Sequence, residues 1–153
     1  MENARPVVVT TVVFGLLYIL SKTLFANVYL FEWTARHFYL LLWVAALALG
    51  FSKAKILSYS ITLGNMVGLV IGQLLGDFIV VQRVAQLPPD AGGSTQYWAH
   101  YHHGVLIWLI VVLAFFLAGL VLNRWFKQRR RQGDVSSVLA DSKEKKKFRQ
   151  SMK

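Results

Sequence analysis

Four long apolar segments limit what this chain can fold into, because about 20 apolar residues in a helix are enough to cross the hydrocarbon core of a bilayer. The segments cover residues 7–28, 33–51, 56–81 and 104–122. The last one, "GVLIWLIVVLAFFLAGLVL", lacks the polar stripe that a surface helix of a soluble protein presents to water. The sequence therefore predicts an all-α integral membrane protein, a bundle of four transmembrane helices formed by residues 1–123.

The distribution of Lys and Arg predicts the orientation of this bundle. Of the 17 Lys and Arg, 11 lie at or after residue 124, while Arg5 precedes the first segment and two lysines follow the second at 53–55. The connections around 28–36 and 82–103 hold one Arg each. Since cytoplasmic loops carry an excess of Lys and Arg, both termini are predicted to be cytoplasmic, with the protein in the plasma (inner) membrane.

Residues 124–153 are predicted to form a disordered, polybasic cytoplasmic tail. The weakly patterned stretch "GDVSSVLADS" separates a basic block next to the membrane from the terminal block "KEKKKFRQSMK". Each basic residue near an anionic leaflet contributes about 1 kcal/mol. The tail either only fixes the topology or also binds anionic lipids or a partner protein, and no aromatic stacking platform suggests specific nucleic-acid binding. The predicted lipid-binding residues are Arg124, Lys127, Arg129, Arg130 and Arg131.

The third apolar segment carries a glycine at every fourth position for four turns. We call this row the glycine seam, and it consists of Gly64, Gly68, Gly72 and Gly76. Each glycine costs a helix about 1 kcal/mol relative to alanine in water, so four on one face imply a compensating contact. In lipid, such small residues allow close backbone approach between helices. The seam predicts tight helix packing, either with another helix of this chain or with a second copy.

Three polar residues flank the glycine seam, and a lysine lies within the first apolar segment. Asn65, Gln73 and Asp77 each follow a glycine and are expected to face protein or water, because an amide in hydrocarbon needs a partner. Lys22 is a charge in a predicted span, which is costly unless it snorkels to the headgroups or has a partner. Asp77 is the predicted partner of Lys22, and the four residues form either a polar path or a buried pair.

The outward connections contain a second group of candidate residues. All four histidines are predicted there, together with Glu32, and imidazoles with carboxylates are ligands for zinc or copper. We therefore consider a divalent metal site, or a pH-sensing cluster, at the outer face. The alternative is that each residue separately faces headgroups or water. The candidate ligands are Glu32, His37, His100 and His103, with Asp77 at the edge of the same cluster.

Several catalytic signatures are missing from the sequence. The chain has no Cys, which excludes thiolate catalysis, and it has no phosphate-binding glycine loop and no GxSxG motif. The sequence favours a non-enzymatic assembly or accessory component that packs through the glycine seam with itself or with a larger membrane protein. Two alternatives stay open: a small oligomeric transporter or channel for an ion or small solute, and a metal-dependent membrane enzyme.

Overall fold

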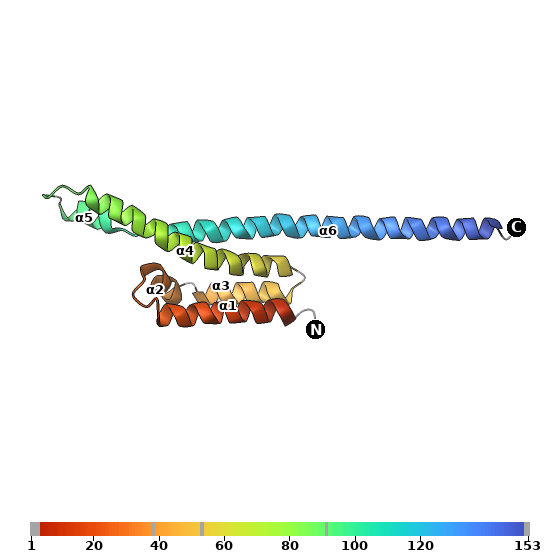
Figure 1. Ribbon diagram of the computed structural model, residues 1–153, viewed down its shortest axis with the longest axis horizontal. Helices are drawn as coiled ribbons and strands as arrows, with labels where there is room; N and C mark the ends of the chain where they lie inside the picture. Colours follow the sequence, from red (N-terminus) through yellow and green to blue (C-terminus); the bar gives the residue numbers. More distant parts are fainter. Residues whose placement is uncertain (1–3, 38, 53, 91, 152–153) are drawn as a thin grey trace.

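The computed structural model describes residues 4–37, 39–52, 54–90 and 92–151, and the side chains of these residues as far as Arg129. The regular secondary structure of this part of the chain is all helical, with no strand, which confirms the predicted all-α class (Figure 1). The elements are α1 (Ala4–Lys22), α2 (Tyr29–Arg36), α3 (Tyr39–Phe51), α4 (Lys55–Ala85), α5 (Gly93–His100) and α6 (Gly104–Ser151).

Among the described residues, three helices are long and apolar enough to cross a membrane. They are Ala4–Lys22, Lys55–Ala85 and the helical part of Gly93–Arg129, most of which belongs to α6. The bent pair α2 and α3 becomes a fourth span if it is counted as one. The presence of helices that can span a membrane is thus confirmed, while the four-span bundle and the orientation of the termini stay predictions.

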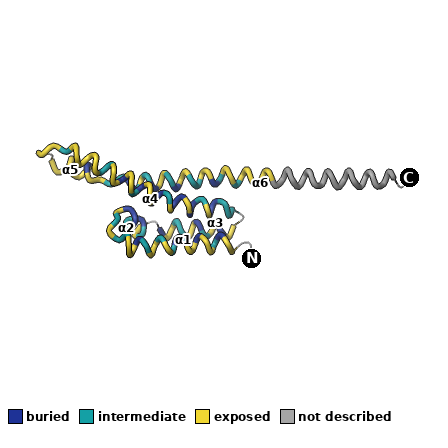
Figure 2. Tube along the Cα trace, in the orientation of Figure 1, coloured by how far each residue is buried: buried dark blue, intermediate teal, exposed yellow. Residues whose placement is uncertain are grey.

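Helix α4 lies at the centre of the bundle. It packs against α6 on one side and against α1 and α3 on the other (Figure 1). Its buried positions therefore lie on more than one face, and Figure 2 shows them as dark blue segments along α4. Glycines Gly64, Gly68, Gly72 and Gly76 are buried, and so are Leu57, Ser58, Ile61, Thr62, Asn65 and Leu69. Helix α4 therefore connects α1 and α3 to α6.

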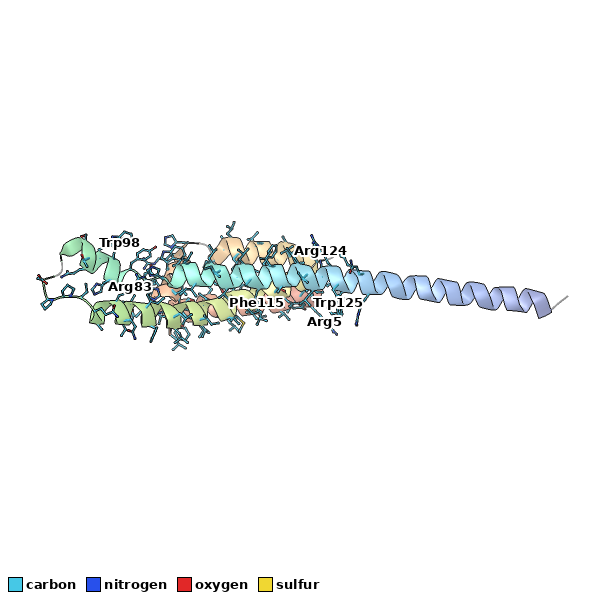
Figure 3. The ribbon with its side chains drawn as sticks, turned by 90° about the horizontal axis from the view of Figure 1, so that it is seen from above. Arg5, Arg83, Trp98, Phe115, Arg124 and Trp125 are labelled. Atoms are coloured by element: carbon cyan, nitrogen blue, oxygen red, sulfur yellow. The ribbon has the colours of Figure 1, made fainter. Side chains whose placement is uncertain are left out.

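The two ends of the bundle have different residues. Arg5, Arg124 and Trp125 gather at one end, which we call the terminal end, and Arg83 and Trp98 lie at the opposite, connector end (Figure 3). The N-terminus and the exit of α6 from the bundle are therefore on the same side, and α6 then continues well beyond the other helices (Figure 1).

The first span is shorter than the predicted 7–28, because α1 ends at Lys22. Two hydroxyls near its end bond back to the helix: Ser21 Oγ donates to Leu17 O at 2.7 Å and Thr23 Oγ1 to Ile19 O at 2.9 Å. The Phe25 N–H then closes the turn on Leu20 O at 2.9 Å. Side-chain bonds of this kind compete with the helical ladder, and Lys22 in the last turn complements the negative end of the helix dipole.

The second predicted span, 33–51, is not one straight helix. It is divided between α2 and α3, which are bent by 69° to each other. Glu32, Arg36 and His37 place charge and polarity in α2 and directly after it, whereas α3 is apolar throughout. Thr34 Oγ1 also donates to the carbonyl of Leu30 at 2.8 Å, a bond that bends helices.

The predicted disorder of the C-terminal tail is wrong. Helix α6 spans 48 residues and continues from the bundle to Ser151. Lys, Arg, Gln, Glu, Ala and Leu dominate this part of the sequence and are good helix formers, and a single Gly133 does not outweigh them. Helix α4 also extends further than predicted, over 31 residues, or about 46 Å. Its last turns stand beyond the bundle beside α5 (Figure 1).

The interior holds two apolar clusters and one group of buried hydroxyls. Leu30, Phe31, Leu69, Trp108 and Val112 join α2, α4 and α6, and Phe14, Tyr39, Ala46 and Ile61 join α1, α3 and α4. The Tyr39 hydroxyl donates to the Phe14 carbonyl. Below them, Thr10 Oγ1 lies 3.1 Å from Ser58 Oγ and 3.3 Å from Thr62 Oγ1, and Ser58 donates to Ala46 O at 2.8 Å. These hydrogen bonds connect α1, α3 and α4. In lipid the hydrophobic effect does not drive helices together, so hydrogen bonds of this kind contribute to their association.

Candidate functional site

The glycine seam faces α6 of the same chain at Gly64, Gly68 and Gly72, and it faces His102, just before α6, at Gly76. A Cβ added at Gly64 would lie 2.8 Å from Phe115 Cβ, and one at Gly68 would lie 3.0 Å from Trp108 Cδ1. Phe115 is labelled on α6 in Figure 3. Contacts this close leave no room for a β-carbon without displacement of α6. The partner that the sequence left open is therefore an internal helix.

The closest approach of two backbones along the seam is between Gly72 and Gly104. A Cβ on Gly72 would lie 2.7 Å from Gly104 O, and a Cβ on Gly104 would lie 2.7 Å from Gly72 O. Two backbones face each other here with no side chain between them. Gly104 opens α6, so the start of this helix is pressed against the middle of α4, an arrangement that Cα–H···O contacts favour.

The connector end of the seam holds a chain of polar contacts between α2, α4 and α6. Gln73 Oε1 accepts the Leu30 N–H at 2.8 Å, and Gln73 Nε2 donates to Asp77 Oδ1 and Oδ2 at 2.9 and 2.8 Å. His102 Nε2 lies 3.1 Å from Asp77 Oδ1. His102 is only 9% exposed, whereas Asp77 is 57% exposed. The network thus begins at a buried backbone donor and ends at a carboxylate that reaches solvent or headgroups.

The hydrogen bonds of His102 determine its tautomer. The Gly104 N–H donates to His102 Nδ1 at 3.1 Å, so Nδ1 carries no proton and Nε2 carries the one that Asp77 accepts. The ring lies in space that Gly76 and Gly104 leave free, because a β-carbon on either glycine would overlap it. Tyr29 covers another side of the ring, with 4.5 Å between centroids. His102 therefore locks the start of α6 onto α4.

Asn65 lies deeper in the same interface. Its Oδ1 accepts the indole N–H of Trp108 at 3.1 Å, and both side chains are buried. The Nδ2 of Asn65 and the Nε1 of Trp43 have no hydrogen-bond partner within the described part of the chain. Asn65 thus faces protein, in agreement with the expectation that an amide avoids lipid, although half of its hydrogen-bonding capacity is unused.

The predicted pair of Lys22 and Asp77 is not formed. Lys22 is exposed at the end of α1, with its Nζ 6.0 Å from the centroid of the Tyr18 ring. Asp77 is bound instead to Gln73 and His102. Because α1 ends at Lys22, the ammonium group is at the end of its helix and not within it, so no buried partner is needed.

The predicted metal ligands do not converge. Glu32 pairs with Arg36 one turn along α2, and His37 bonds to the Trp33 carbonyl at 2.8 Å and stacks on the Trp33 ring. His100 bonds to the carbonyl of its own helix, at Gln96 O, 2.8 Å away. Among the residues that the structure describes, no group of three or more His, Asp or Glu is placed to hold a metal ion. Each of the side chains of Glu32, His37 and His100 is bonded within its own helix, which the sequence does not reveal.

The remaining charged candidates lie at opposite ends of the molecule. Arg83 Nη1 is 3.5 Å from both ring nitrogens of His103 and 3.5 Å from Trp98 O at the connector end. At the terminal end Arg129 lies over the Trp125 ring, 4.0 Å from its centroid, and Arg124 and Lys127 are exposed. The side chains of Arg130 and Arg131 are outside the described residues.

Two residues of the site are absent from the sequence-based candidates. In the sequence His102 is one of four histidines in the outward connections, and Gly104 is the first residue of an apolar segment. The one local signal is that a histidine two residues before a glycine can accept that glycine's N–H, as His102 does here. No periodicity links these two residues to α4, so the pairing needs the fold.

The polar network should stabilise the fold measurably. Asp77→Ala removes the acceptor for both Gln73 Nε2 and His102 Nε2, and hydrogen bonds to a charged group contribute about 1.5–3 kcal/mol when they are shielded. Since Asp77 is half exposed, we expect a loss of about 1 kcal/mol in the free energy of unfolding. Thermal unfolding in detergent measures this, with Asp90→Ala in the exposed turn before α5 as control. Equal stability of the two variants would contradict a structural role for the network.

Comparison with models of protein families, with curated proteins and with solved structures finds no match for this chain. Its class therefore follows from the fold and the site. In the part that the structure describes, it is an all-α protein with three helices that can span a membrane. Its central helix, α4, packs closely against α6 and carries polar side chains that bond to neighbouring parts of the same chain.

Proposed function

We propose that this chain is a non-enzymatic component of the plasma (inner) membrane, with both termini in the cytoplasm, that assembles with an acidic partner. The polar side chains on α4 support a structural role over catalysis or transport: Asn65, Gln73 and Asp77 are engaged in hydrogen bonds that join helices. The glycine seam is filled by α6, which supports assembly through a different surface.

The observation that carries this proposal is the length of α6. We call residues 124–151, the part of α6 beyond the bundle, the arm. It projects away from the other helices along the line of the span (Figure 1). An extension of this kind contributes nothing to the interior of the bundle, so its role is to contact something outside the bundle.

The geometry of the arm distinguishes its two basic blocks. Residues 143–149 lie at least 21 residues beyond Leu122, which corresponds to about 31 Å along a helix. Electrostatic attraction to the membrane surface falls off within a Debye length of about 8 Å at physiological salt. The block at 124–131 can therefore act on its own leaflet, whereas the distal block acts on something in the cytoplasm.

The charge of the arm favours an acidic partner over a second copy of the arm. From residue 124 onward, 11 Lys and Arg face three acids, Asp134, Asp141 and Glu144. Two such arms side by side would bring like charges together, which is unfavourable. A protein surface rich in Asp and Glu offers the complementary potential.

The test compares two variants with five substitutions each. In the distal variant Lys143, Lys145, Lys146, Lys147 and Arg149 become Gln, and in the proximal variant Arg124, Lys127, Arg129, Arg130 and Arg131 become Gln. Gln keeps the helix propensity of Lys and Arg nearly unchanged. We expect the wild type and the proximal variant to migrate on native gels of solubilised membranes in a complex larger than the monomer.

The distal variant should migrate alone, at an equal amount in the membrane fraction. If the distal variant keeps the complex, the arm is not the assembly surface. If all three proteins migrate alone, the chain is not a component of a stable assembly, and the alternative of an independently acting membrane protein gains.

A further inference from the structure

A side pocket of about 470 Å³ opens between α3 and the start of α6, towards the surroundings of the bundle. Its walls are almost wholly apolar and include Leu42 and Ala45 from α3 and Leu106 and Leu109 from α6. Trp33 and Tyr101 line it from α2 and from the α5–α6 connection. Both aromatic residues belong to the connector end, so the pocket runs from that end into the apolar part of the bundle.

Cationic and hydrogen-bonding groups gather beside the mouth of this pocket. Tyr101 packs against the ring of His103, with 5.0 Å between centroids, and Arg83 lies 3.5 Å from that ring. On the other side, His37 stacks on Trp33 at 4.6 Å. Arg83 is exposed and has no carboxylate partner within the described part of the chain. The positive charge at this mouth is thus available to a ligand.

We propose that this pocket binds one anionic phospholipid of the surrounding bilayer, with an acyl chain between α3 and α6 and the phosphate at Arg83 and His103. An apolar slot with a few polar groups at one end matches an amphiphile. Arg suits phosphate oxygens because its planar fork donates two parallel hydrogen bonds. Trp33 and Tyr101 are the residue types that lie at the headgroup level, so they place the mouth at the membrane surface.

The size of the pocket favours a flexible chain over a partner helix. Its lining residues on α3 lie within 41–45 and those on α6 within 105–109. That length is little more than one turn of each helix, whereas a docked helix is about 10 Å wide and needs a groove along several turns. The volume lies within the range of about 300–1,000 Å³ that small-ligand sites occupy.

The experiment measures the thermal unfolding midpoint of the full chain in a neutral detergent. Phosphatidylglycerol, phosphatidylcholine with the same acyl chains, and inorganic phosphate are added separately. A ligand that binds only the folded state raises the midpoint. We expect phosphatidylglycerol to raise it more than phosphatidylcholine, and phosphate alone to leave it unchanged.

Matched substitutions then locate the site. Ala45→Trp fills the pocket, whereas Ala48→Trp, at another exposed position of α3, does not line it. The shift with phosphatidylglycerol should disappear in Ala45→Trp and persist in Ala48→Trp, and Arg83→Gln should reduce it to the phosphatidylcholine value. If Ala45→Trp already unfolds earlier in detergent alone, Leu106→Trp replaces it.

Three results would overturn the proposal. Equal shifts with the two lipids would remove the anionic headgroup site. A shift that survives both Ala45→Trp and Leu106→Trp would place the lipid elsewhere. An equal shift with inorganic phosphate would show a phosphate site without a lipid chain. None of these results depends on the arm, so the assembly proposal is tested separately.

Discussion

Gly72→Leu is expected to lower the free energy of unfolding more than a leucine placed at any glycine outside the interface of α4 and α6. Extra atoms in a well-packed interior cost about 1–3 kcal/mol. We expect the upper end of this range, because the new side chain meets Gly104 O, 2.7 Å from its Cβ, and backbone cannot rotate away. Displacement of α6 would also separate His102 from Asp77. Thermal unfolding in detergent, followed by circular dichroism, measures the loss.

Gly15→Leu is the matched control for this substitution. Gly15 is also inside an apolar helix, but nothing lies within 4 Å of a Cβ built on it. Both variants gain the same helix propensity, about 1 kcal/mol relative to glycine in water. The difference between them therefore isolates the packing of the seam. Equal unfolding temperatures for the two variants would mean that α4 and α6 do not approach as closely as the structure has them.

Trp108→Ala is the second substitution with a large expected effect. Trp108 is 3% exposed and lies in the cluster with Leu30, Phe31 and Leu69. Truncation of a buried Trp costs about 3–5 kcal/mol through the lost contacts and the cavity left behind. It also leaves Asn65 Oδ1 without the indole donor, and an unpaired buried amide is costly. We expect the variant to unfold at a much lower temperature or to fail to fold in detergent.

Two further variants separate packing from hydrogen bonding at this position. Trp98→Ala, at a site that is 62% exposed, should leave the unfolding temperature nearly unchanged. Trp108→Phe keeps a large ring and loses only the donor, so its cost should fall by adding Asn65→Leu, which removes the orphaned amide. If the double variant is no more stable than Trp108→Phe, the Asn65–Trp108 hydrogen bond contributes nothing to stability.

The helical class and the membrane-spanning segments could be predicted from the sequence because both follow from local chemistry. An apolar run as long as Ile56–Val81 has few ways to satisfy its backbone other than a helix, whatever the rest of the chain does. The face that carries Gly64, Gly68, Gly72 and Gly76 is equally local, since a repeat of four residues defines it. The helix that packs against this face is distant in sequence, and the periodicity of α4 contains no information about α6.

The wrong predictions concern features that depend on a few polar atoms or on contacts between residues far apart in the sequence. The break between α2 and α3 follows Glu32, Arg36 and His37. The mean hydropathy of residues 33–51 hides the effect of these few polar side chains. The link between Asp77 and His102 spans 25 residues of sequence, with a turn and α5 between them. The prediction that Lys22 pairs with Asp77 rested on similar depth in the membrane, and depth does not determine which side chains face each other.

The central position of α4 affects the order in which contacts between the helices can form while the chain is being synthesised. Thr10 on α1 and the Leu30 N–H at the start of α2 both have their partners on α4, at Ser58, Thr62 and Gln73. Helices α1 and α3 contact each other directly, because the Tyr39 hydroxyl donates to the Phe14 carbonyl, but the hydrogen bonds that join α1 and α2 to α4 form only after α4 has been synthesised. The residues that cover Gly64, Gly68, Gly72 and Gly76 lie largely within 102–115, so the seam is the last part of the interior to be covered.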